Sequence, residues 1–240
     1  MIKFFRKIRQ QLLTDNKFSK YLIYAIGEIV LVVIGILIAL QINNWNQNKL
    51  SNKKGIIALI GLKESIYQDS IMLLNLQEYK IDKVLKSIAI LKSKPVYHDS
   101  LGKHFDKLRS RVIIRMDNSV FEELKSTGLN LFKNDSIKNE IINYYKFCYF
   151  TENDTHTEIN RFNETIAEPF LFNNFERSDC VDDDCWIPKD YSALIINPDY
   201  NTLLLEKERT MEYGKMLVRL SKEYSSEMIN FIETEIIKND

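Results

Sequence analysis

The chain has 240 residues with 33 Lys or Arg and 33 Asp or Glu, and this zero net charge argues against a dedicated nucleic-acid binder. Apolar residues make up 45% and charged residues 28%, which is typical of a globular protein and excludes a wholly disordered chain. Only 7 Gly and 4 Pro are present, so collagen-like and many-turned all-β folds are disfavoured and a few long helices are expected.

Residues 1–20 form a basic segment at the start of the chain. The segment carries six basic residues and a single acid, Asp15. Its apolar residues, among them Phe4, Ile8 and Leu12, recur at helical spacing. We therefore expect a cytoplasmic amphipathic element that can lie among the headgroups of anionic lipids. A plain basic tail that only sets the orientation of the chain is the alternative.

Residues 21–42 read YLIYAIGEIVLVVIGILIALQI and predict a transmembrane helix. At about 1.5 Å per residue, this helix would be about 33 Å long, enough to cross the hydrocarbon core of a bilayer. Tyr21, Tyr24 and Trp45 suit the aromatic belts at the two interfaces. A buried core helix and a cleavable signal peptide are the alternatives. The basic flank and the length disfavour the former, and the lack of a small-residue cleavage site after Ala39 disfavours the latter.

The basic residues around this span predict its orientation. Six precede it, whereas only Lys49, Lys53 and Lys54 follow it closely. Because cytoplasmic flanks carry the excess of Lys and Arg, the N-terminus should be cytoplasmic and residues 43–240 should lie outside. The sequence thus predicts an uncleaved signal anchor.

One ionisable residue, Glu28, lies seven residues inside the apolar span. An ionised carboxylate is costly in a bilayer, so such residues usually face protein or water or are protonated. Glu28 shares a helical face with Gly35 and Ala39, and small residues let helices approach closely. We predict that this face packs against another helix, most simply in a homodimer. A single helix with a neutral or snorkelling glutamate, and a proton or ion pathway, are the alternatives.

Residues 43–240 predict an antiparallel helical bundle, so the expected fold class is all-α. Helical spacing of apolar residues persists over 49–91 and stops at Pro95. Residues 96–116 mix short helical and irregular character. Further helices are expected over about 117–128, from the Asn134 cap to the Glu168-Pro169 boundary, and over 200–237.

Residues 169–200 are predicted to form one long loop, because they contain three of the four prolines. They also contain Cys180 and Cys185, which flank four residues. A disulfide between this pair is geometrically possible and is expected in an oxidising compartment. Two free thiols or a metal pair are the alternatives, although zinc needs three or four ligands. Cys148 lies among aromatic residues and is predicted to be a buried hydrophobe.

Two stretches of the sequence are similar to known proteins. The first comprises MIKFFRKIRQQLL and KFSKYLIYAIGEIVLVVIGILIALQINNWN and is near-continuous over residues 1–46. The second is FEELKSTGLNLFKNDSIKNEIINYY, residues 121–145, and is looser. Both resemble a family of Bacteroidota membrane proteins of unknown function. The resemblance implies a bacterial inner-membrane anchor with a periplasmic helical domain. It carries no known activity, so it transfers no catalytic residue.

The sequence contains no nucleotide-binding, metalloprotease or serine-hydrolase motif. His98, His104 and His156 are candidates for a metal site or a general base, but their spacing is poor for ligands, so surface positions are expected. We therefore expect no enzyme, metal or cofactor. Two functions remain: a membrane-anchored scaffold or protein-interaction module that binds another envelope protein or itself, and a ligand-sensing module that acts with a separate signalling subunit.

Overall fold

A computed structural model of the chain is almost entirely helical. It describes residues 18–93, 96–127, 129–132, 134–179 and 184–239. The chain divides into two units, Met1–Lys54 and Gly55–Asp240. Within the described residues the sheet content is a single two-stranded hairpin, so the predicted all-α class is confirmed.

Helix α2, Phe18–Gln68, contributes residues to both units. Among the residues that the structure describes, one helical run, Leu22–Lys92, is long and apolar enough to cross a membrane. None of its most apolar stretch is buried inside the chain. A core helix would bury that stretch, so α2 carries a candidate membrane span near the N-terminus.

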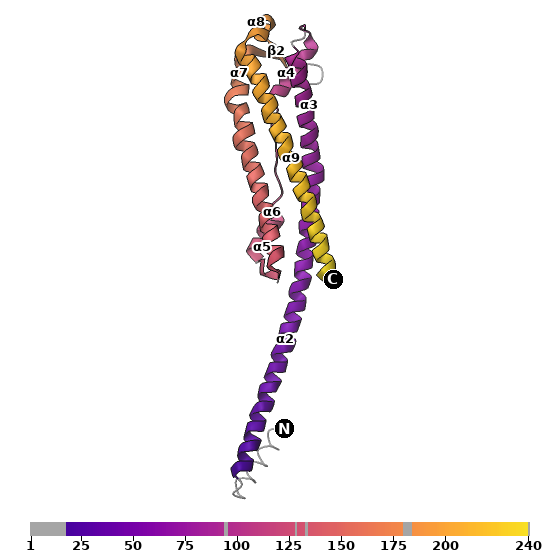
Figure 1. The fold of residues 1–240 in the computed structure, drawn as a ribbon, viewed down its shortest axis with the longest axis vertical. Helices are drawn as coiled ribbons and strands as arrows, with labels where there is room; N and C mark the ends of the chain where they lie inside the picture. Colours follow the sequence, from indigo (N-terminus) through magenta and orange to yellow (C-terminus); the bar gives the residue numbers. More distant parts are fainter. Residues whose placement is uncertain (1–17, 94–95, 128, 133, 180–183, 240) are drawn as a thin grey trace. The chain divides into compact units, whose positions relative to one another are not determined.

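Three helical columns make up most of the second unit (Figure 1). The first column consists of the end of α2, the π-helix η1 (Asp69–Leu74) and α3 (Asn75–Lys92). The second column is α9 (Pro198–Asn239). The third contains α6 (Asp135–Asp154), the π-helices η5 (Thr155–Asn160) and η6 (Asn163–Ala167), and α7 (Glu168–Asn174). The helices predicted over 49–91, from the Asn134 cap, and over 200–237 are thus confirmed.

The buried face of α9 explains how one long helix packs against both other columns. Its buried positions recur in steps of four and three, as in a coiled coil. This series comprises Tyr200, Leu204, Lys207, Met211, Gly214, Val218, Ser221, Ser225, Met228, Ile232 and Glu235, and Leu203, Thr210 and Leu217 beside it are buried as well. Ion pairs of 2.6 Å between Lys92 and Glu208 and of 2.9 Å between Glu78 and Arg219 join α3 to α9 in antiparallel order.

Short elements occupy the ends of the columns. They are η2 (Asp99–Leu101), α4 (Gly102–Asp106), η3 (Lys107–Arg109), α5 (Ser119–Thr127), η4 (Leu129–Leu131), β1 (Phe175–Asp179), β2 (Asp184–Pro188) and α8 (Tyr191–Ile196). The strands pair antiparallel, with Phe175 opposite Pro188 and Asp179 opposite Asp184. The hairpin packs on α4, which places it at one end of the unit.

The prediction of one long loop over 169–200 is wrong, because these residues contain most of α7, the hairpin and α8. The prolines lie where a missing N–H is tolerated. Pro169 is in the first turn of α7, Pro188 ends β2, and Pro198 begins α9. For the same reason the third column does not stop at Glu168-Pro169 but continues to Asn174.

An extended segment, residues 110–118, runs between α9 and the third column (Figure 1). We call it the central segment. Its side chains alternate, with Val112, Ile114 and Met116 buried and the residues between them exposed. Within the described residues it pairs with no strand, so its backbone polar groups need other partners in the interior.

Side chains from all three columns supply these partners. Asn160 accepts a hydrogen bond from the Val112 N–H at 3.3 Å and donates to its carbonyl at 2.9 Å. Gln77 accepts from the Ile113 N–H at 3.3 Å, and Asp69 accepts from the Asp117 N–H at 2.6 Å. The central segment is therefore bonded to its neighbours by side chains rather than by a sheet.

Gly214 lets α9 approach the central segment closely. A Cβ atom at this position would lie 2.8 Å from Cγ2 of Val112 and 3.1 Å from Cδ1 of Ile159. Both neighbours are buried and β-branched, so they have little freedom to move away. The absence of a side chain at Gly214 is thus a packing requirement.

We expect Gly214→Ala to destabilise the protein by about 1–2 kcal/mol, because overpacking outweighs the gain of about 1 kcal/mol in helix propensity. The matched control is Gly61→Ala in α2, where a Cβ atom meets nothing within 4 Å. That change should leave stability equal or raise it by up to about 1 kcal/mol. Thermal unfolding of the full chain in detergent, followed by circular dichroism, measures both. A rise in stability for both variants would show that the contact with Val112 relaxes freely.

Candidate functional site

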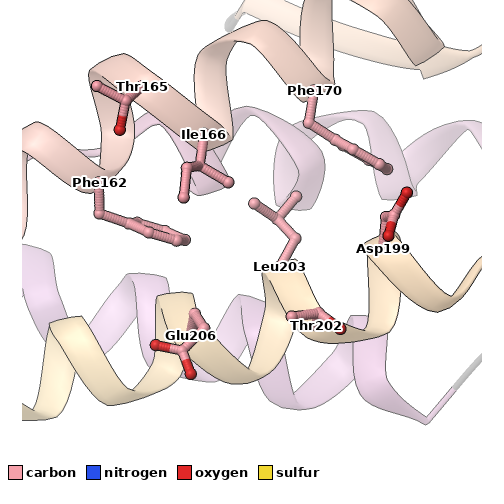
Figure 2. Close-up of a pocket in the computed structure, with 8 residues that line it drawn as sticks. All are labelled: Phe162, Thr165, Ile166, Phe170, Asp199, Thr202, Leu203 and Glu206. Carbon is pink, nitrogen blue, oxygen red and sulfur yellow. The ribbon is translucent and has the colours of Figure 1, made fainter.

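The second unit contains a groove between the start of α9 and the third column, with a volume of about 340 Å³ (Figure 2). Its lining residues are Phe162, Thr165, Ile166, Phe170, Asp199, Thr202, Leu203 and Glu206. Figure 2 shows Ile166 and Leu203 pointing toward each other from the two walls, with the rings of Phe162 and Phe170 on either side. The floor of the groove is therefore apolar and partly aromatic.

The polar side chains of the groove are hydrogen-bond acceptors. Thr165 donates its hydroxyl proton to the Arg161 carbonyl at 2.8 Å, and Thr202 donates to the Pro198 carbonyl at 3.0 Å. Each hydroxyl therefore keeps only lone pairs for a ligand. The other polar lining residues, Asp199 and Glu206, are acids.

The two acids differ in their partners. Glu206 accepts a hydrogen bond of 2.9 Å from Arg209, one turn further along the exposed side of α9. Asp199, in the first turn of the same helix, has a carboxylate with no ion-pair partner in the described part of the chain. Asp199 is therefore the acid that remains available to a ligand.

Lys207 follows Glu206 on α9 but is fully buried. Its Nζ donates to the Ser110 carbonyl at 2.7 Å and to Oδ1 of Asn163. Asn163 in turn donates to the same Ser110 carbonyl at 2.9 Å. Lys207 therefore bonds α9 to the central segment and to η6 and does not line the groove.

The charge state of Lys207 follows from its burial. Desolvation lowers the pKa of Lys207 from 10.5 to about 7, and the positive charge of Arg111 adds to this, whereas Glu168 acts in the opposite direction. Arg111 itself pairs with Glu164 at 2.9 Å and with Glu168 at 3.0 Å. A neutral amine has two N–H donors, which match the two acceptors that Lys207 contacts. The fold thus favours the uncharged lysine.

Asp69, the first residue of η1, is a second buried ionisable group that bonds to the central segment. Burial raises the pKa of Asp69, and the hydrogen bond from the Asp117 N–H offsets part of this effect. The pKa of Asp117 is lowered instead, because its carboxylate accepts hydrogen bonds from the backbone and side chain of Ser119. Both acids therefore hold backbone in place.

The three histidines considered from the sequence do not meet. His98 caps η2 by accepting from the Ser100 N–H at 3.2 Å. Nδ1 of His104 lies 3.0 Å from the hydroxyl of Ser87, and His156 is exposed on η5. The described residues contain no group of three or more side chains that could hold a metal ion.

The cysteine predictions have different outcomes. Cys148 is buried with a free thiol, as predicted, and burial raises the pKa of that thiol to about 12. Cys180 lies outside the described residues, whereas the backbone of Cys185 pairs with Ser178 in the hairpin. The disulfide between Cys180 and Cys185 stays a prediction.

The transmembrane packing face also stays a prediction. Glu28, Gly35 and Ala39 all lie on α2 in the first unit. Gly35 and Ala39 are exposed and Glu28 is half-buried, in a chain described without a partner. Their common helical face follows from their spacing alone.

Neither the groove nor the role of Lys207 was predicted from the sequence. The groove combines residues 162–170 with residues 199–206, which only the tertiary structure brings together. A signal for Lys207 was present, because the apolar steps of four and three along α9 pass through this charged residue. A lysine at a core-facing position indicates a buried partner or an altered pKa.

The lowered pKa of Lys207 predicts a specific pH dependence. Because the unfolded chain holds this proton up to a pH near 10.5, protonation opposes folding, and stability should fall as the pH drops from 10.5 to 7. Between pH 9 and pH 7 the protein should lose about 2 kcal/mol relative to Lys207→Met, with little further relative change below pH 6. Chemical unfolding of both proteins in detergent at several pH values measures the difference.

The matched control for this experiment is Lys146→Met, which replaces an exposed lysine of α6. Its stability should differ from that of the parent protein by the same amount at every pH. A pH-independent difference for Lys207→Met as well would show that the lysine keeps its ordinary pKa in the folded protein.

No curated protein and no solved structure matches the chain. The family model of DUF6090, a family of unknown function, matches residues 28–151, which is more than half of the chain. The matched range contains most of the apolar stretch of α2 and all of the central segment, whereas the groove and Lys207 follow it. The chain therefore belongs to this family of unknown function, DUF6090.

Proposed function

We propose that the protein is a non-enzymatic, single-pass membrane anchor whose helical unit binds another protein outside the cytoplasm. The observation that carries this proposal is that α2 contains both the candidate span and the first core residues of the second unit, Leu59, Leu62 and Ile66. A helix of this kind ties a folded unit directly to the bilayer. The bacterial inner membrane is the proposed location, with the basic N-terminal segment in the cytoplasm.

The use of the buried and half-buried polar residues around the central segment supports a role in binding rather than in catalysis. Asp69, Gln77, Asn160 and Lys207 each bond backbone groups of the central segment. Catalytic groups instead face a space that a substrate can enter. These side chains are better explained as supports of a rigid surface.

A ligand-sensing module that acts with a separate signalling subunit is the second candidate function. The groove favours it, because an apolar floor with a few polar groups is the usual form of a small-molecule site. Both functions require the same anchored architecture. They differ in whether a protein or a small molecule co-purifies with the chain.

Affinity purification of the full chain from detergent-solubilised membranes tests the proposal. We expect a second protein in stoichiometric amount, identified by mass spectrometry and absent from a purification of an unrelated single-pass protein with the same tag. A bound small molecule with no such protein would contradict the scaffold and favour the sensor.

Orientation is tested separately with a reporter enzyme that is active only outside the cytoplasm. We expect activity when the reporter follows Asp240 and none when it precedes Met1, because six basic residues flank the N-terminal side of the span. A reporter that is active in the cytoplasm alone should give the reverse result. If instead the first reporter is active only at the N-terminus, the proposed orientation is wrong.

A further inference from the structure

The lining of the groove indicates which kind of ligand it can bind. Its apolar lining consists of Phe162, Ile166, Phe170 and Leu203, which favours a ligand with an apolar part. Its hydroxyl protons are already donated to helix carbonyls, so the remaining polar groups accept hydrogen bonds. A complementary ligand therefore combines an apolar body with hydrogen-bond donors.

The charged residues around the groove favour a ligand whose hydrogen-bond donor is positively charged. Asp199 and Glu206 line it, and no basic side chain does. The nearest lysine in sequence, Lys207, is buried and bonded to Ser110 and Asn163. Glu206 is already paired with Arg209, whereas the Asp199 carboxylate has no ion-pair partner within the described residues. An anion would therefore meet an uncompensated carboxylate at Asp199, whereas a cation would form a charge-assisted hydrogen bond with it.

The aromatic side chains of the groove also favour a cationic ligand. The faces of phenylalanine rings attract cations within about 6 Å and also pack well against other rings. Figure 2 shows Phe162 and Phe170 at opposite ends of the apolar lining, with the ring of Phe170 pointing toward Asp199. A cationic group next to Asp199 could therefore contact Phe170 while its apolar body covers Ile166 and Leu203.

The size of the groove restricts the ligand further. Its volume of about 340 Å³ is near the lower end of the range for small-molecule sites, which is about 300–1,000 Å³. One ring with a short side chain fits this space. We propose that the groove binds a small organic ammonium or guanidinium compound with an aromatic or branched apolar body. This site is independent of the partner protein proposed above.

The test uses the full chain in a non-ionic detergent, with the methyl groups of Ile, Leu and Thr labelled for NMR. The probes are phenethylamine, phenethyl alcohol and phenylacetate, which share a ring and differ in charge. We expect phenethylamine to shift the methyl signals of Ile166 and Leu203 in a saturable way at millimolar concentration. The alcohol should bind at least about fivefold more weakly, and the anion should cause no saturable shift.

Variants locate the charge that recognises the amine. Asp199→Asn should weaken the binding of phenethylamine about fivefold and leave that of the alcohol unchanged. Glu206→Gln serves as the second variant if the first does not fold, and should act in the same direction. The matched control is Glu212→Gln, an exposed acid elsewhere on α9, which should change neither affinity.

Three results would overturn the proposal. They are equal affinity for the amine and the alcohol, an effect of Glu212→Gln as large as that of Asp199→Asn, and shifts spread evenly over methyl groups far from the groove. The last result would indicate that the probe only enters the detergent micelle. If no protein partner co-purifies with the chain, the proposed scaffold function is contradicted, but the proposed ligand site is not.

Discussion

The hydrogen bonds from buried and half-buried side chains to the backbone of the central segment hold the second unit together. A backbone N–H or carbonyl that is buried without a partner costs about 1–3 kcal/mol, so an extended segment inside a helical bundle needs bonds from its neighbours. Asp69 and Gln77 provide them from the first column, Asn160 from the third, and Lys207 from α9. Each column is thereby placed in a fixed register with residues 110–118.

The π-helices lie where this register is set. η1 begins with Asp69, η5 ends with Asn160, and η6 begins with Asn163. A π-helical turn contains an extra residue and rotates the side chains that follow. In this unit it brings a polar side chain to the central segment while the apolar residues on both sides still face the core. The irregular helices are therefore a consequence of bonding a non-helical segment.

This arrangement separates the residues that build the fold from those that remain for recognition. Lys207 and Asn163 are fully buried and bonded to each other and to Ser110. The groove lies between α9 and the third column, which also contain Lys207 and Asn163, but its acids, Asp199 and Glu206, are at the surface. A rigid interior with an acidic, partly aromatic surface site suits a protein that binds and does not transform its partner, as proposed above.

The helices, the apolar span and the Asn134 cap could be predicted from the sequence, because the periodicity of apolar residues and capping depend on neighbours within one or two turns. The prediction that the third column ends at Pro169 was wrong, because a proline is tolerated in the first turn of a helix. Pro169 lies in the first turn of α7, which begins directly after the π-helix η6. The roles of Lys207 and Gly214 and the position of the groove could not be predicted in this way. Each depends on residues from separate columns that meet only after the chain has folded, for example Lys207 with Ser110 and Gly214 with Val112.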